Sequence, residues 1–285
     1  MKNITLMMVL ATVTLAAVSC GSKKTQTSDA SEKTAPKMLV IYYSQTSNTK
    51  AVATEIATRL GADIAEIIPV VPYENDFKAT LDRGKKELDE GIFPEIQPMS
   101  VKPADYEVIF IGYPIWFGTY APPVATFLNQ VDLSGKKLVP FCTFGSGGEE
   151  SSVMDLAKAE PKAEILPSYG VRAARLDAMP QEIDQFLKAN GFIEGDFVKL
   201  EEFPEQHLVT EEEAAIFDAA VGDYPMMHAQ ASMVASRTLP NGIEYLFTAK
   251  DLPREENPDM PPMGEMMVYV TVADGEAPVF TKVVR

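Results

Sequence analysis

The sequence has few of the residues from which metal and nucleophilic sites are usually built. It contains two cysteines, Cys20 and Cys142, and two histidines, His207 and His228, in 285 residues. No Cys or His spacing is typical of a zinc site, and the two histidines are too few and too far apart to define a site. No Ser-His-Asp arrangement stands out either. We therefore assign no catalytic and no metal-binding residue from the sequence.

Positive charge is also scarce. Lys and Arg number 25 against 41 Asp and Glu, so the formal net charge at pH 7 is −16. A surface of this sign disfavours nucleic acid as a partner, and it favours a basic partner by electrostatic steering. The length allows two domains.

Glycine, lysine and arginine are all missing from the segment Ser44-Gln45-Thr46-Ser47-Asn48-Thr49. This segment lies between an apolar run at 38–43, read as a buried parallel strand, and a helical pattern with Val52, Ile56 and Leu60 on one face. A turn before a helix N-terminus can bind an anion, because the first backbone N–H groups of the helix have no partner within it. The missing Gly-Lys-Ser/Thr argues against a P-loop, and the missing glycine argues against a dinucleotide fingerprint. The segment thus predicts an anion held by neutral donors, or else an ordinary turn with a helix cap.

Two further buried runs end in distinctive turns. Residues 108–113 are followed by Pro114-Ile115-Trp116-Phe117-Gly118, which contains the only tryptophan. Residues 137–142 are followed by Thr143-Phe144-Gly145-Ser146-Gly147-Gly148, where small residues allow close backbone approach. Open α/β sheets bind ligands at the carboxyl ends of their strands. Hydroxyls, an aromatic turn and a small-residue loop together favour a flat aromatic ligand that carries one phosphate.

These three segments resemble the flavodoxin-like, FMN-binding family over roughly residues 37–193. The resemblance implies that FMN is the cofactor and that the first turn holds its phosphate. It implies that Trp116 and its neighbours flank the isoalloxazine ring, and that the third loop lines the other side. The residues implied for cofactor binding are Ser44, Thr46, Ser47, Asn48, Thr49, Pro114, Ile115, Trp116, Phe117, Gly118, Thr143, Phe144, Gly145, Ser146, Gly147 and Gly148. Many relatives have glycine where this chain has Ser47.

The rest of residues 37–195 alternates strand and helix patterns. Residues 63–67 alternate as an edge strand does. Helices are predicted over 76–90, over 118–130 with a start at Tyr120 or after Pro122-Pro123, over 149–159 and over 180–190. A fifth strand is predicted over 163–166, with Val171 as a candidate further member. This alternation predicts a doubly wound parallel sheet. The edge character of the second strand favours the flavodoxin-like five-stranded order 2-1-3-4-5.

The pattern changes in residues 196–285. Thr210 and Glu213 form a capping-box sequence that begins a helix through Val221. Strands are predicted over 231–239, 243–249, 265–273 and 278–284, with a hairpin turn at 240–242. One helix on an antiparallel sheet is an α+β domain, and its order is similar to the cystatin-like fold. Methionines cluster here, a pattern that suits either adaptable core packing or Cu(I) binding.

The N-terminus resembles a bacterial lipoprotein signal. Lys2, an apolar stretch and Ala17-Val18-Ser19 precede Cys20. The resemblance implies a signal peptide at 1–19, lipidation of Cys20 and a flexible tether at 20–36. An ordinary secretory signal with an incidental cysteine is the alternative. We expect a lipid-anchored protein of the bacterial envelope, at the outer membrane and facing the periplasm.

These features together predict a membrane-anchored FMN protein that transfers electrons to or from a redox protein or a small electron acceptor. One alternative is an NAD(P)H-dependent quinone or flavin reductase of the same fold. Another is a non-redox scaffold or binding protein in which the C-terminal domain carries the function.

Overall fold

The computed structural model describes residues 36–222, 224, 227–253 and 264–284. The predicted signal peptide, Cys20 and nearly all of the predicted tether lie outside these residues. No helix in the described ranges is long and apolar enough to cross a bilayer.

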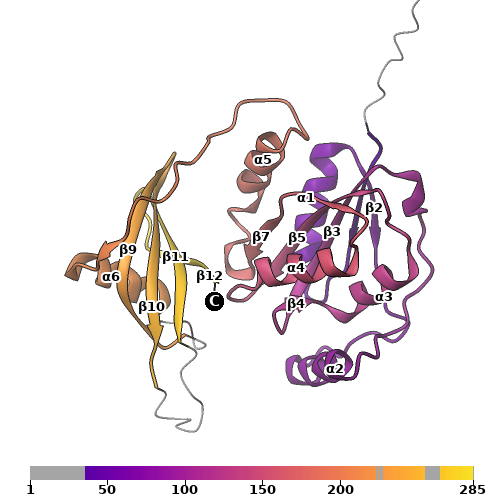
Figure 1. Ribbon diagram of the computed structural model, residues 1–285, viewed down its shortest axis with the longest axis horizontal. Helices are drawn as coiled ribbons and strands as arrows, with labels where there is room; N and C mark the ends of the chain where they lie inside the picture. Colours follow the sequence, from indigo (N-terminus) through magenta and orange to yellow (C-terminus); the bar gives the residue numbers. More distant parts are fainter. Residues whose placement is uncertain (1–35, 223, 225–226, 254–263, 285) are drawn as a thin grey trace, which may run out of the picture. The chain divides into compact units, whose positions relative to one another are not determined.

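A parallel sheet forms the first half of the described chain (Figure 1). Its strands are β1 (Met38–Tyr42), β2 (Asp63–Glu66), β3 (Val108–Trp116), β5 (Lys137–Phe144), β6 (Glu164–Ile165) and β7 (Tyr169–Arg172), and β4 (Thr119–Tyr120) pairs antiparallel with the end of β3. The order along the sheet is β2-β1-β3-β5-β6, and β7 also pairs with β5. The predicted doubly wound fold and its strand order are therefore confirmed.

Helices cover both faces of this sheet because its central strands are apolar on both sides. The helices are α1 (Asn48–Leu60), α2 (Phe77–Glu90), α3 (Pro122–Gln130), α4 (Glu149–Ala159) and α5 (Met179–Ala189), with short 3-10 turns at Pro103–Asp105 and Ala173–Arg175. Ile56 of α1 and Ile183 of α5 pack with Val40 on one face, whereas Phe127 of α3 and Leu156 of α4 pack with Leu39 on the other. Alternate residues of β1 thus enter opposite cores.

Two boundaries differ from the sequence prediction. The fifth strand is split into β6 and β7, both paired with β5, because residues 166–168 are not in strand conformation, although Leu166 N–H still donates to Leu138 O. The third helix begins at Pro122, between the two starts that the sequence allowed, because residues 119 and 120 form β4 and Ala121 takes an extended N-cap conformation. Proline suits the first turn of a helix, where its missing N–H has no acceptor in any case.

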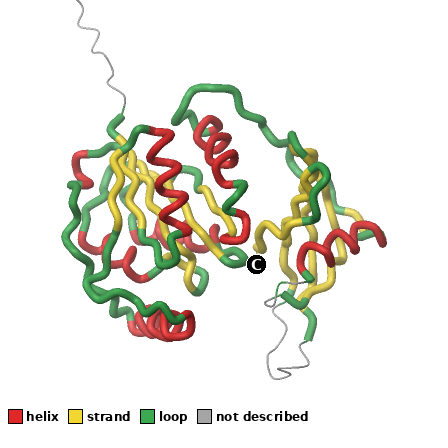
Figure 2. Tube along the Cα trace, turned by 180° about the vertical axis from the view of Figure 1, so that it is seen from behind, coloured by secondary structure: helices red, strands yellow, loops and turns green. Residues whose placement is uncertain are grey.

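The second half is an antiparallel sheet with one helix, as predicted (Figure 2). Its elements are β8 (His207–Leu208), α6 (Glu211–Val221), β9 (Ala229–Leu239), β10 (Gly242–Asp251), β11 (Glu265–Ala273) and β12 (Val279–Val284). The sheet order is β12-β11-β10-β9-β8, of which the short β8 was not predicted. Phe217 and Val221 of α6 pack against Phe247 and Val268, and Thr210 and Glu213 form the predicted capping box.

Candidate functional site

Three turns meet at the carboxyl ends of β1, β3 and β5. The sheet register places Tyr42 beside Gly112 and Pro114 beside Thr143, so the turns that follow these strands are neighbours. A hydrogen bond of 2.8 Å joins the hydroxyls of Thr49, in the first turn of α1, and Thr143, at the end of β5. The three predicted binding segments therefore occupy one edge of the sheet.

The first turn retains a polar group without a partner. Ser44 Oγ is buried and has no hydrogen-bond partner among the described residues. A buried hydroxyl normally finds a partner, because leaving it unpaired costs about 1–3 kcal/mol. It lies beside the N-terminus of α1, where backbone N–H groups and the helix dipole favour a negative charge. A bound anion would satisfy both features.

Two other groups define the charge and shape of this turn. Ser47 has a left-handed φ of 68° at the N-cap of α1, and its side chain makes no capping hydrogen bond. Its hydroxyl therefore does not cap the helix. The nearest cation in sequence, Lys50, has its Nζ 3.6 Å from Glu66 Oε2 on β2. The turn itself therefore contains no cation, and the lysine that follows it in sequence is paired with Glu66.

The second turn is a tight reversal between β3 and β4. Phe117 and Gly118 have φ of 53° and 82°, as both central residues of a type I′ turn do. Gly118 O accepts a hydrogen bond of 2.6 Å from Ser151 Oγ on α4. This bond ties the second turn to the helix that follows the third loop.

Sequence reasoning placed the indole of Trp116 against the ring, but the structure buries this side chain in the core. It makes edge contacts with Tyr43 and Tyr73, at centroid distances of 6.0 and 5.0 Å, and it packs on Gly84 of α2. Only 9 % of it is exposed, whereas 51 % of Phe117 is exposed. The exposed aromatic side chain at this turn is therefore Phe117. Trp116 instead packs in the core next to the turn.

The third loop contributes backbone more than side chains. Thr143 and Phe144 are buried, the first bonded to Thr49 and the second in the core, so the accessible part of the loop is Gly145 to Gly148. The neighbouring thiol of Cys142 is fully buried, and burial raises its pKa well above the usual value. Cys142 therefore lacks the thiolate character of a reactive cysteine.

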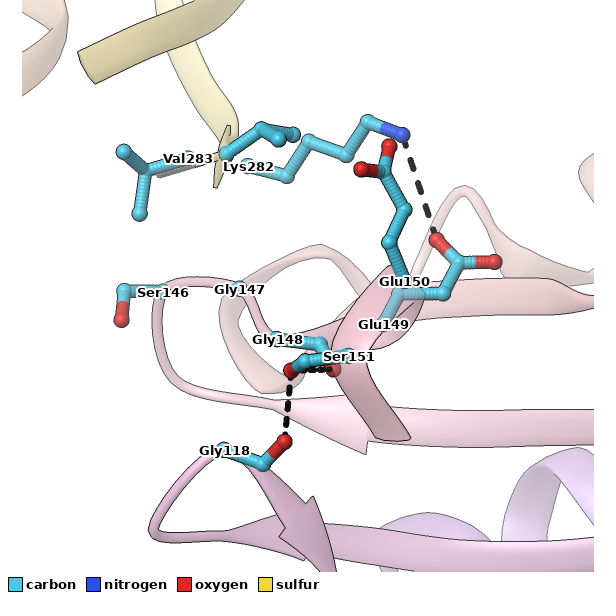
Figure 3. Close-up of a pocket in the computed structure, with 10 residues that line it drawn as sticks. Gly118, Ser146, Gly147, Gly148, Glu149, Glu150, Ser151, Lys282 and Val283 are labelled. Carbon is cyan, nitrogen blue, oxygen red and sulfur yellow. Dashed lines mark hydrogen bonds and ion pairs between the residues drawn. The ribbon is translucent and has the colours of Figure 1, made fainter. Parts of the chain in front are cut away.

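A pocket of about 270 Å³ opens between the second and third turns (Figure 3). Its lining comprises Gly118, residues 146–151 and residues 282–284. Sequence reasoning missed residues 149–151 and 282–284. The first group directly continues a predicted loop and could have been included, but no sequence signal connects the C-terminal strand with this loop.

Metal binding receives no support from residues near the pocket. Within the described ranges no three His, Cys, Asp or Glu side chains gather as a metal site would require. Of the methionine-rich region, Met226, Met260 and Met263 lie outside the described residues, while Met227 and Met266 are buried in the core of the second sheet.

The strand order and the three turns at one sheet edge define a flavodoxin-like α/β domain. Residues 37–175 match the model of the flavodoxin family, so this part of the chain is similar to flavodoxins. The chain is similar to a solved putative flavoprotein from Bacteroides eggerthii, with 27 % identity over 55 % of this chain and 99 % of that one and a TM-score of 0.50. It is also similar to a putative flavoprotein from Bacteroides uniformis, with 26 % identity, coverage of 52 % and 98 %, and a TM-score of 0.47. A flavoprotein from Lactobacillus acidophilus, solved in complex with FMN, is 24 % identical, with coverage of 48 % and 93 % and a TM-score of 0.44.

Proposed function

We propose that this protein binds FMN at the edge of its parallel sheet and transfers electrons. The observation that carries the proposal is the unpartnered Ser44 hydroxyl at the N-terminus of α1, in a domain similar to flavodoxins. Hydroxyl and backbone N–H groups there suit a phosphate, and the absence of a cation from the turn suits a monoester that needs only neutral donors. Bound FMN would supply one- and two-electron redox chemistry.

The chain's own residues would bind and orient the cofactor. Ser44, Thr46, Ser47, Asn48 and Thr49 would hold the phosphate end. The exposed Phe117, the Gly118 backbone and the loop 145–148 would bound the ring. Gly118 and residues 146–148 also line the pocket between the second and third turns. Small residues in this loop would let the backbone approach a flat ligand closely.

Binding is tested by titrating the protein with FMN while flavin fluorescence is followed, with riboflavin as the control that lacks the phosphate. We expect tight, quenched binding of FMN and much weaker binding of riboflavin. Equal affinity for both flavins would contradict a phosphate site, and no binding of either would support the scaffold alternative.

Electron transfer is favoured over a reductase activity because no basic residue lines the pocket except Lys282, which lies 3.9 Å from Glu149. An NADPH site would need cations for the additional phosphate. Steady consumption of NADH or NADPH with a quinone would instead establish the reductase. The acidic balance of the chain suits a basic redox protein as the partner.

We also propose that the protein is anchored to the bacterial envelope through lipid on Cys20. The small residues before this cysteine support the proposal, and the polar stretch after it would act as a tether. Metabolic labelling with a fatty acid tests it. Label should appear in the wild type and be lost in Cys20→Ser, whereas label that persists in this variant would contradict the anchor.

A further inference from the structure

The loop 145–148 is held by Arg172, near the end of the segment that matches the flavodoxin family, and by β12, which lies outside that segment. Three consecutive residues of the loop contact either Arg172 or Val283. Gly145 O accepts a hydrogen bond from Arg172, Ser146 O accepts one of 2.8 Å from Val283 N–H, and Gly147 forms a parallel bridge with Val283. Val283 lies on β12, the edge strand of the antiparallel sheet. Figure 3 shows β12 above the loop, at the mouth of the pocket.

Arg172, at the end of β7, links the loop and β12. Its Nε donates to Gly145 O at 2.8 Å, and one terminal nitrogen donates to Phe280 O at 2.5 Å. The guanidinium also lies over the ring of Phe280, 4.1 Å from the centroid. Only 9 % of Arg172 is exposed. An arginine rarely occupies such a buried place unless its donors are satisfied there, so the contact is specific.

The contact between Gly147 and β12 leaves no room for a side chain. A Cβ at Gly147 would lie 2.1 Å from the carbonyl oxygen of Val283. Beside it, Lys282 Nζ lies 3.9 Å from Glu149 Oε2, and Glu149 also accepts a hydrogen bond from Ser168. The loop is therefore restrained from Gly145 to Glu149 by contacts with Arg172, β12 and Ser168.

We propose that Arg172 and β12 form a latch that holds loop 145–148 in its ligand-receiving conformation, so that the C-terminal sheet is a working part of the cofactor site. This inference rests on the proposed FMN function. A loop with three glycines loses much conformational freedom when it becomes ordered. A latch that orders the loop in advance removes this cost from ligand binding. By linkage, flavin binding then strengthens the contact of β12 with the loop by the same factor.

Arg172 is a positioning residue. Two substitutions, one at Arg172 and one on β12, each remove part of the contact that holds the loop. Arg172→Met removes both donated hydrogen bonds but keeps a long apolar stem. Val283→Pro removes the N–H that bonds Ser146, at an edge strand where proline is tolerated if the lost N–H points away from the neighbouring strand. Arg172→Lys keeps the charge and can retain one of the two bonds.

A matched control is Arg237→Met. Arg237 also lies over an aromatic ring, 4.4 Å from the Phe203 centroid, and it donates to Glu201 O and Glu244. All its contacts lie within the C-terminal part of the chain. Its loss removes interactions of the same kind without touching loop 145–148.

The experiment measures the FMN dissociation constant of the full chain and hydrogen exchange of the peptide over β12, with and without FMN. We expect Arg172→Met and Val283→Pro to weaken FMN binding roughly tenfold, within the range typical of coupled sites. The FMN dissociation constant of Arg172→Lys should lie between those of these two variants and that of the wild type. The dissociation constant of Arg237→Met should equal that of the wild type. FMN should slow hydrogen exchange at β12 in the wild type but should not slow it in Arg172→Met.

Two results would overturn the latch while leaving the proposed function intact. One is unchanged FMN affinity in Arg172→Met although β12 exchanges faster. The other, which needs no folded variant, is wild-type protein that binds FMN without any change in exchange at β12. Failure of the wild type to bind FMN would overturn both the proposed function and the inference.

Discussion

The parallel sheet has an apolar core on both faces, whereas the described residues of the antiparallel sheet form one core, beneath α6. In the parallel sheet, polar groups such as Ser44, Thr49 and Thr143 gather at the ends of the central strands. In the antiparallel sheet, buried and accessible residues alternate along β11, as expected for a sheet with one solvated face. Topology thus selects where a ligand site can form, and the second sheet contacts loop 145–148 through its edge strand.

The substitution with the largest expected effect destabilises the core of the antiparallel sheet and leaves the core of the parallel sheet intact. Phe217→Ala removes a fully buried ring that contacts Phe247 at a centroid distance of 5.2 Å, so we expect the second core to lose about 3–5 kcal/mol. Calorimetry should then show the antiparallel sheet unfolding before the parallel one. Leu208→Ala, at a side chain that is 76 % exposed, is the control. One unchanged cooperative transition in Phe217→Ala would show that the two cores are not separable in this way.

A second substitution acts at the ends of the parallel strands. Thr49→Val keeps the shape of the side chain but removes the hydroxyl that bonds Thr143, so apo stability should fall by about 1–3 kcal/mol. FMN binding should weaken about tenfold, since the hydroxyl that we propose as a donor to the phosphate is lost as well. Fluorescence titration and thermal unfolding measure the two effects. Thr54→Val, at an exposed position of α1 whose hydroxyl bonds only Lys50 O, should change neither by a comparable amount.

The third prediction concerns backbone strain in the first turn. Ser47→Gly should stabilise the protein by about 1 kcal/mol, because a left-handed φ of 68° is unfavourable for a residue with a Cβ. The midpoint of thermal unfolding should rise. Thr46→Gly, at a neighbouring residue without a positive φ, should not raise it. A lower midpoint in Ser47→Gly would mean that the serine side chain stabilises the turn through another contact.

The smallest effect belongs to the cap of α6. Burial raises the pKa of the Glu213 carboxyl, but hydrogen bonds from Thr210 and His207 outweigh this and leave the pKa below its usual value. The stabilisation is therefore present above about pH 4.5 and is lost as pH falls through the lowered pKa. Glu213→Ala should cost about 0.5–1 kcal/mol at pH 7 and progressively less in acid. Unfolding curves at several pH values measure this difference, and Glu212→Ala should show no such trend.

The sequence predicted the sheet order because its signals are local. Buried runs at 38–43, 108–113 and 137–142 and the capping box at Thr210 each mark an element within a few residues. The interruption between β6 and β7 lacked such a signal, because both strands are very short.

The position of side chains at the site was harder to predict because it depends on distant residues. Trp116 is buried by Tyr73 and Gly84, and no local pattern distinguishes it from the exposed Phe117 beside it. No local sequence pattern marks Arg172 either, because its partner Phe280 on β12 is distant in sequence. The cofactor-binding roles of the turn residues stay predictions, while their gathering at one sheet edge is a feature of the structure.

The most direct test of a neutral phosphate site is a crossed titration of the wild type and Ser44→Ala with FMN and with riboflavin. Ser44→Ala removes an unpartnered buried hydroxyl, so the apo protein should be as stable as the wild type or more so. The account predicts that FMN binding weakens about tenfold, as expected for loss of a hydrogen bond to a charged group, while riboflavin binding is unchanged. An equal loss for both flavins, or no loss for either, would contradict it.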